Sequence, residues 1–188
     1  MTTPEQPESE SIYQIKVTLR DSHPPIWRRV RLSGDTTLEE LHHVIQVVMD
    51  WENYHMHHFI ADDRSYGLDE DFMPDPESER STTLQEVAPR PKDRLLYEYD
   101  FGDSWEHDVL VEKVLQPEEG VRYPVCLEGK RAAPPEDCGG IWGYYDMLEA
   151  IEDEDHPDHE DMLEWVGGDF DPEAFNLDEV NRRLEALR

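Results

Sequence analysis

Basic residues are scarce in this 188-residue sequence: 17 Lys and Arg stand against 46 Asp and Glu, which gives a formal net charge of −29. Binding to the phosphates of DNA or RNA depends on clustered Lys and Arg that release counterions. Anionic membrane surfaces attract the same residues. We therefore expect no generic nucleic-acid partner and no membrane partner. The acidic surface fits either high solubility or a salty cytosol.

Cysteine and long apolar runs are also lacking. Cys126 and Cys138 are separated by eleven residues, so no Cys-x-x-Cys pair supports a zinc ribbon. No stretch approaches the roughly 18 apolar residues of a membrane span, and residues 1–11 are too polar for a signal peptide. These absences predict a cytoplasmic protein with two free thiols.

Residues 95–112 carry the clearest local pattern. Apolar side chains occupy odd positions on both sides of a Gly-Asp turn, while Glu and Asp occupy most even positions. This period of two predicts a central hairpin with one buried face, which also holds Asp103 and His107. Because parity is the same before and after the turn, we expect an odd-numbered loop, Phe101 to Asp103, with positive φ at or beside Gly102.

The sequence before this hairpin predicts a β-β-α opening. Residues 1–11 have the composition of a disordered tail, and alternation over residues 12–32 indicates a first hairpin. Thr37-x-x-Glu40 is a capping box that begins a helix. We expect a single α+β domain over residues 12–188. Its sheet is predicted to be mixed or antiparallel with a β-grasp-like order, and its C-terminal helices should pack on that sheet.

The remaining elements follow from shorter patterns. We expect a weak strand at 55–61, an irregular acidic excursion at 62–94 with a helical turn at 83–87, a short strand at 122–128, and helices at 144–151, from about 158, and at 177–187. Residues 132–140 contain two prolines and two glycines, which predict an irregular, stiff loop.

Several motifs occur in a characteristic order. They are Trp27-Arg28-Arg29, Trp51 followed by His55-Met56-His57, Tyr99-Asp100-Phe101-Gly102-Asp103-Ser104-Trp105-Glu106-His107, Pro134-Pro135-Glu136-Asp137-Cys138-Gly139-Gly140 and Phe170-Asp171-Pro172-Glu173. On these motifs the chain resembles the plasmid pRiA-type ORF-3-like family, also labelled TnpR-like, over nearly all residues after Ser11. The resemblance implies a compact α+β domain, sometimes encoded near mobile elements, and implies no activity. The nucleophilic Ser, its arginines and the basic DNA-binding segment of a serine recombinase are not found.

Histidine and carboxylate side chains supply one candidate site. His57 and His107 fall on strands that can be neighbours, and Asp103 is close to His107 in the sequence. Two imidazoles and a carboxylate suit a divalent transition metal with an open position for water, which would make the protein a metal-dependent, hydrolase-like enzyme. The alternative is that His107 hydrogen-bonds inside the core, and spacing alone favours it.

The first hairpin holds five of the basic residues, including Arg28 and Arg29. These arginines could hold a phosphate or an acidic peptide, or they could pair with the protein's own carboxylates. The favoured hypothesis is a non-enzymatic interaction module for a protein or small ligand, serving a mobile element or its host. It would use these arginines or the face near Trp105 and Trp142.

The loop residues Glu136, Asp137 and Cys138 form a third candidate. A thiol near a helix N-terminus has a lowered pKa, which would favour nucleophilic chemistry at Cys138. The alternative is a rigid connection whose carboxylates cap the following helix, and a lone cysteine identifies no reaction.

Overall fold

The structure is a computed structural model that describes residues 10–67 and 77–188. In chain order they form β1 (Ile12–Leu19), β2 (Trp27–Ser33), α1 (Leu38–Val48), β3 (His57–Ala61), β4 (Arg64–Gly67), β5 (Glu77–Ser78), α2 (Leu84–Val87), β6 (Arg94–Tyr99), β7 (Trp105–Leu115), β8 (Val125–Lys130), α3 (Gly140–Glu152), α4 (His159–Trp165) and α5 (Leu177–Leu184). Most of the predicted tail, residues 1–9, lies outside the described residues.

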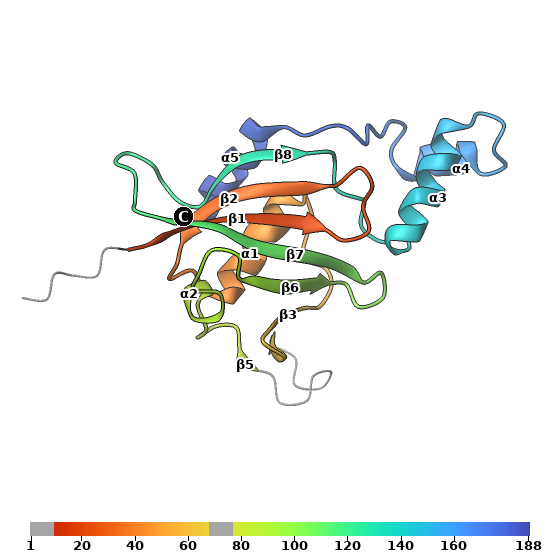
Figure 1. The fold of residues 1–188 in the computed structure, drawn as a ribbon. Coiled ribbons are helices and arrows are strands. Elements are labelled where there is room, and N and C mark those ends of the chain that lie inside the picture. Colours follow the sequence, from red (N-terminus) through yellow and green to blue (C-terminus); the bar gives the residue numbers. More distant parts are fainter. Residues whose placement is uncertain (1–9, 68–76) are drawn as a thin grey trace, which may run out of the picture.

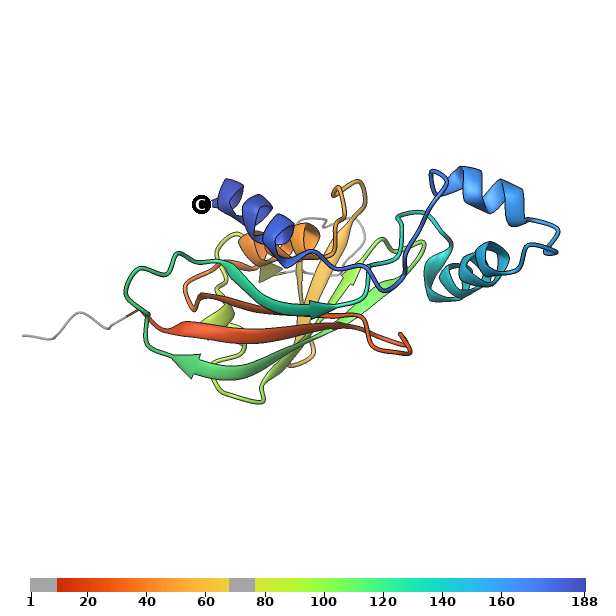
Figure 2. The ribbon, with the colours of Figure 1, turned by 90° about the horizontal axis from the view of Figure 1, so that it is seen from above.

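The described strands form one sheet in the order β5-β4-β3-β6-β7-β1-β2-β8 (Figure 1). All neighbours run antiparallel except β4 and β5, which run parallel. Helices α1 and α5 lie on the same face of the sheet (Figure 2). The apolar core fills the space between these helices and the sheet, as expected for two packed layers.

β1 lies between β2 and β7 in the middle of this sheet. Ile15 pairs with Val30 of β2 and Val111 of β7, and all three side chains are buried. Full burial of one such aliphatic side chain contributes about 1.5–3 kcal/mol. The first hairpin and the buried face of the central hairpin, both predicted from alternation in the sequence, are therefore confirmed.

Helix α1 begins at the predicted capping box. The Thr37 hydroxyl accepts from the Glu40 N–H at 3.2 Å, and the Glu40 carboxylate accepts from the Thr37 N–H at 2.8 Å. Leu38, Leu41 and Ile45 are fully buried on one side of the helix. Their spacing of three and four residues places them together on the core-facing side of α1.

The central hairpin joins β6 to β7 through five residues, 100–104. The odd number is confirmed, but the predicted three-residue turn is wrong. Positive φ occurs at Asp100 (59°) and Ser104 (57°), not at or beside Gly102. The physical reason is a side-chain turn: Asp100 Oδ1 accepts from the N–H groups of Gly102 (3.0 Å) and Asp103 (3.3 Å). Aspartate tolerates left-handed backbone better than most residues.

Residues 62–94 hold more regular structure than predicted. β4 pairs with β3, β5 adds a short parallel strand, and α2 forms at the expected helical turn. The segment 68–76 of this excursion lies outside the described residues. The short strand expected at 122–128 is present as β8, which begins and ends slightly later.

Only one of the three C-terminal helices packs on the face of the sheet. α5 contacts β8 and α1, whereas α3 and α4 contact each other and extend beyond the end of the sheet (Figures 1 and 2). The prediction that the C-terminal helices pack on the sheet is therefore wrong for α4, while α3 packs against the end of the sheet, where its Tyr144 joins the buried core. The start of α3 touches the central hairpin at Gly140. A Cβ added there would lie 2.5 Å from the backbone oxygen of Asp103, and the φ of 71° also favours glycine at this position.

An antiparallel sheet with helices segregated from the strands supports the predicted α+β class. The β-grasp-like order is not confirmed, because both neighbours of β1 run antiparallel to it. Within residues 10–67 and 77–188, every helix is too short or too polar to cross a bilayer.

Candidate functional site

The structure does not bring together the predicted metal ligands His57, Asp103 and His107. Among the described residues, the ligand atoms of these three side chains do not all lie within 4.8 Å of one another. Each has another partner. His57 Nε2 lies 2.9 Å from the carboxylate of Glu79, His107 Nδ1 lies 3.3 Å from a backbone carbonyl of β6, and Asp103 Oδ2 accepts from the backbone N–H of Gly139 at 3.1 Å.

His57 belongs to a buried polar network between α1 and the sheet. Its ring stacks on His42 with centroids 3.4 Å apart, and His42 Nδ1 lies 2.8 Å from the hydroxyl of Tyr97. Burial, together with the nearby His57, lowers the pKa of His42 to about 3, so His42 is neutral. Glu79 is fully buried, and its Oε1 has no hydrogen-bond partner within residues 10–67 and 77–188. The network joins the helix layer to the sheet.

His107 is fully buried, as the core interpretation of this residue predicts. Burial lowers the pKa of its imidazole to about 4. In the part of the chain that the structure describes, its Nε2 has no hydrogen-bond partner. Its ring packs on Trp51 and Tyr97 at centroid distances of 5.2 and 5.4 Å. These contacts make His107 a neutral core residue.

The first-hairpin arginines contact groups of the protein itself. Arg28 is buried and donates to backbone carbonyls of α1 (2.7 Å) and β8 (3.0 Å), and burial lowers its pKa to about 10. Arg29 forms ion pairs with Glu112 (2.7 Å) and Glu128 (2.6 Å). The hydrogen bond to Glu112 raises the pKa of Arg29. Arg29 therefore agrees with the alternative that the arginines pair with the protein's own carboxylates, whereas Arg28 binds backbone carbonyls.

Trp105 and Cys138 do not provide the predicted reactive or exposed groups. Trp105 is 1% exposed, so no binding face forms around it, whereas Trp142 on α3 is 81% exposed. Cys138 precedes α3, but burial and the nearby Asp103 raise the pKa of its thiol to about 12. The predicted lowering of this pKa by the helix start is therefore wrong, because desolvation outweighs it.

Three loops converge where the central hairpin meets the start of α3. His55 precedes β3, Asp100 follows β6 and Asp137 precedes α3, and their ligand atoms all lie within 4.8 Å of one another. We name these three residues the His55 cluster. The neighbouring Glu136 accepts hydrogen bonds from the Tyr99 hydroxyl and from the backbone N–H of Glu52. Glu136 thereby fixes the loop that presents Asp137.

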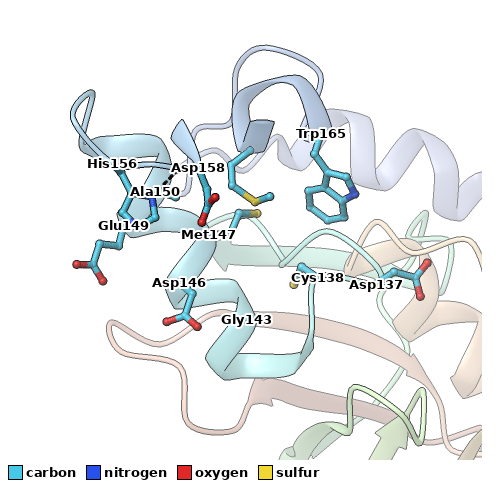
Figure 3. Close-up of a pocket in the computed structure, with 11 residues that line it drawn as sticks. Asp137, Cys138, Gly143, Asp146, Met147, Glu149, Ala150, His156, Asp158 and Trp165 are labelled. Carbon is cyan, nitrogen blue, oxygen red and sulfur yellow. Dashed lines mark hydrogen bonds between the residues drawn. The ribbon is translucent and has the colours of Figure 1, made fainter. Parts of the chain in front are cut away.

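A groove of about 500 Å³ lies between α3 and α4, and Asp137 lines one end of it. Its floor is apolar: Met147 is 3% exposed, and Met162 and Ala150 also line it. Figure 3 shows Met147 between Asp158 and Trp165. The two helices are held together by His159 of α4, whose Nδ1 lies 2.9 Å from the carbonyl of Ala150 in α3.

The rim of this groove is acidic. Asp146, Glu149 and Asp158 are exposed lining residues, and in the described part of the chain none of them has an ion-pair partner. Residues 132–181 contain 17 Asp and Glu and no Lys or Arg. Carboxylates gathered without a counter-charge create a negative potential that attracts cations. The groove is therefore suited to a positively charged ligand.

Local sequence patterns could not reveal either arrangement. The His55 cluster draws one residue from each of three loops that are far apart in the sequence. The groove depends on how α3 meets α4. One signal was available: residues 132–181 lack basic residues entirely, while Met147, Met162 and Trp165 are spaced among their carboxylates.

Comparisons with known proteins point to one family. The chain is 37% identical over 180 residues to the uncharacterized protein y4hQ of Sinorhizobium fredii, covering 94% of this chain and 92% of the relative. A crystal structure of a protein of unknown function, MM3350 from Methanosarcina mazei Go1, is similar with a TM-score of 0.81 and 41% identity, covering 91% of this chain and 98% of that one. The family model for the plasmid pRiA4b ORF-3-like protein matches residues 11–179. The chain therefore belongs to the plasmid pRiA4b ORF-3-like protein family.

Proposed function

We propose that the protein is a non-enzymatic binding module whose groove between α3 and α4 receives a Lys or Arg side chain of a partner protein. The observation that carries this proposal is a rim of carboxylates that have no ion-pair partner among the described residues and lie above an apolar floor. A surface that is both acidic and apolar matches the two parts of a basic side chain, its charged head and its aliphatic stem.

The groove offers a contact for each part of such a side chain. The stem would lie along Met147 and Met162, and the ammonium or guanidinium group would meet Asp146, Glu149 or Asp158. A charged donor bound to a carboxylate forms a stronger hydrogen bond than a neutral donor. The face of Trp165, which is 47% exposed, adds a cation–π contact.

The size and surroundings of the groove favour a macromolecular partner. A volume of about 500 Å³ holds one long side chain and its neighbours, within the range of ordinary ligand sites. Trp142, on the same helix, is 81% exposed. Exposed tryptophans are enriched at the energetic centres of protein interfaces. The net charge of −29 would speed the approach of a basic partner.

Calorimetric titration with short peptides tests the proposal. A glycine-spaced peptide carrying one Lys and one Arg should bind, and the same peptide with both replaced by Gln should not. The double variant Asp146→Asn, Glu149→Gln should bind the basic peptide about tenfold more weakly, since each partly exposed ion pair contributes up to about 1 kcal/mol.

The matched control is the double variant Asp153→Asn, Glu154→Gln. These exposed residues lie in the same acidic region, and neither lines the groove. Affinity in this control should stay within about twofold of the original protein at 150 mM salt, where screening limits distant charges. Equal weakening in both double variants would show a diffuse charge effect and would contradict a site in the groove. Binding of spermidine without binding of the peptide would contradict a protein partner and would indicate that the ligand is a free amine.

The rival function, a metal-dependent hydrolase built on His57, Asp103 and His107, has less support, because each of these side chains already has a protein partner. Service to a mobile element, which the family resemblance implied, stays a prediction.

A further inference from the structure

The His55 cluster has the composition of a metal site. It combines one imidazole with two carboxylates, and three separate loops present them at one end of the sheet. Ca²⁺ and Mg²⁺ prefer ligand sets made of oxygen alone, whereas an imidazole nitrogen favours zinc and its transition-metal neighbours. The donors therefore match a divalent transition metal of the zinc type.

The distances between the donors also fit such an ion. His55 Nε2 lies 2.9 Å from Asp137 Oδ1 and 3.6 Å from Asp100 Oδ2. Tetrahedral zinc, with bonds of about 2.0–2.2 Å to nitrogen and oxygen, holds its ligand atoms about 3.3–3.5 Å apart. The two observed separations lie on either side of this range, so adjustments of about half an ångström would complete the geometry.

An unpartnered nitrogen points into the cluster. His55 Nε2 is shielded from solvent, yet no described residue offers it an acceptor in hydrogen-bond geometry. A buried nitrogen in this state is costly unless another group binds it. Asp137 Oδ1 and Asp100 Oδ2 both lie within 4 Å of this nitrogen but outside hydrogen-bond geometry, a placement that suits a cation between the three atoms.

Asp100 is held rigidly for this role. Its side chain is 10% exposed, and Oδ1 accepts hydrogen bonds from the N–H groups of Gly102 and Asp103. Oδ2 is left facing His55. The side chain of Asp137 is 66% exposed, so one flank of the cluster is open to solvent. Three protein ligands with an open flank are typical of zinc sites that keep a position for water or another ligand.

We propose that His55, Asp100 and Asp137 bind one divalent transition metal ion, with zinc as the preferred ion and its remaining position open to an exogenous ligand. This site is separate from the binding of basic side chains proposed above, although Asp137 also lines the groove. Metal content and peptide affinity are measured independently, so one proposal can fail without the other.

The test is metal content after removal and replacement of metal. Untagged protein is treated with chelator, loaded with Zn²⁺, desalted and analysed by inductively coupled plasma mass spectrometry. We expect about one zinc per chain, and a rise in melting temperature on loading. Replacing zinc with Co²⁺ should produce the visible absorption of nitrogen- and oxygen-bound cobalt in low-coordinate geometry.

Two variants and one matched control locate the ion. The variants His55→Ala and Asp137→Asn should each lose the bound zinc and the gain in melting temperature. The control His23→Ala removes an exposed histidine elsewhere and should retain both. Circular dichroism checks that each variant is folded, and Asp137 is exposed enough for its substitution to be tolerated. Zinc below about 0.2 per chain in the loaded protein, or equal zinc in all variants, would overturn the proposal.

Discussion

The stability of this protein should fall steeply between pH 7 and pH 5 because two neutral histidines are buried in its core. His42 and His107 are 1% and 0% exposed, and their pKa values are lowered by burial to about 3 and about 4. As the pH falls through the usual value of about 6.5, the unfolded chain takes up two protons that the folded protein does not accept. The stabilisation is complete well above pH 6.5. It is lost progressively down to about pH 4 for His107 and about pH 3 for His42.

The magnitude follows from proton linkage. Between pH 7 and pH 5 an ordinary histidine in the unfolded chain gains most of a proton, which lowers the free energy of unfolding by about 2 kcal/mol for each buried histidine. The pair should lower it by about 4 kcal/mol, a large part of the 5–15 kcal/mol that stabilises a typical domain. Most carboxylates remain ionised down to pH 5, so they contribute little over this interval.

Urea unfolding at pH 7, 6 and 5 provides the measurement, with His107→Phe as the key variant. Phenylalanine keeps a ring beside Trp51 and Tyr97 and removes the titrating group, so the fall between pH 7 and pH 5 should shrink by about 2 kcal/mol. His107→Gln is the second variant in case the larger ring overpacks the core. If the original protein and both variants lose stability equally over this interval, the assignment of His107 as a buried neutral histidine is refuted.

Three further predictions concern single groups. Glu79→Ala leaves His57 without its carboxylate partner and should lower the free energy of unfolding by about 3 kcal/mol, whereas Glu79→Gln should cost clearly less, as urea titration would show. Thr37→Ala removes the hydroxyl that caps α1 and should cost about 1 kcal/mol in the same assay, and no change would contradict the capping box. Iodoacetamide at pH 8 should label Cys138 and Cys126 at least about a hundredfold more slowly in the folded protein than in urea, because burial raises their pKa values to about 12 and about 11. Rapid labelling of the folded protein, followed by mass spectrometry, would contradict that burial.

Elements whose signals are local were predicted well. The alternation of residues 12–32 and 95–112 fixed which side chains face the core, and the capping box at Thr37 placed the start of α1. The turn between β6 and β7 was predicted less well. Its geometry is set by the Asp100 side chain binding backbone N–H groups ahead of it, and a glycine in the turn was a misleading signal.

The candidate site was harder to predict because its parts are brought together by tertiary structure. His57 and His107 lie on strands, as predicted, but their side chains contact other protein groups. His55 was assigned to a strand and lies in a loop. The same holds for α3 and α4, whose apolar spacing predicted helices without showing that they leave the sheet. A sequence gives the faces of each element, but the meeting of distant loops depends on the packing of the whole chain.

The central place of β1 has a consequence for synthesis on the ribosome. β1 is the first strand to emerge, but its neighbour β7 follows β2 by about seventy residues. At 5–20 residues per second, this interval lasts roughly 4 to 14 s. During that time the β1–β2 hairpin presents an unpaired edge and an apolar face to the cell. The nascent chain is therefore most exposed to misassociation before the central hairpin is translated, and synonymous codons that slow translation of residues 34–104 should lower its yield.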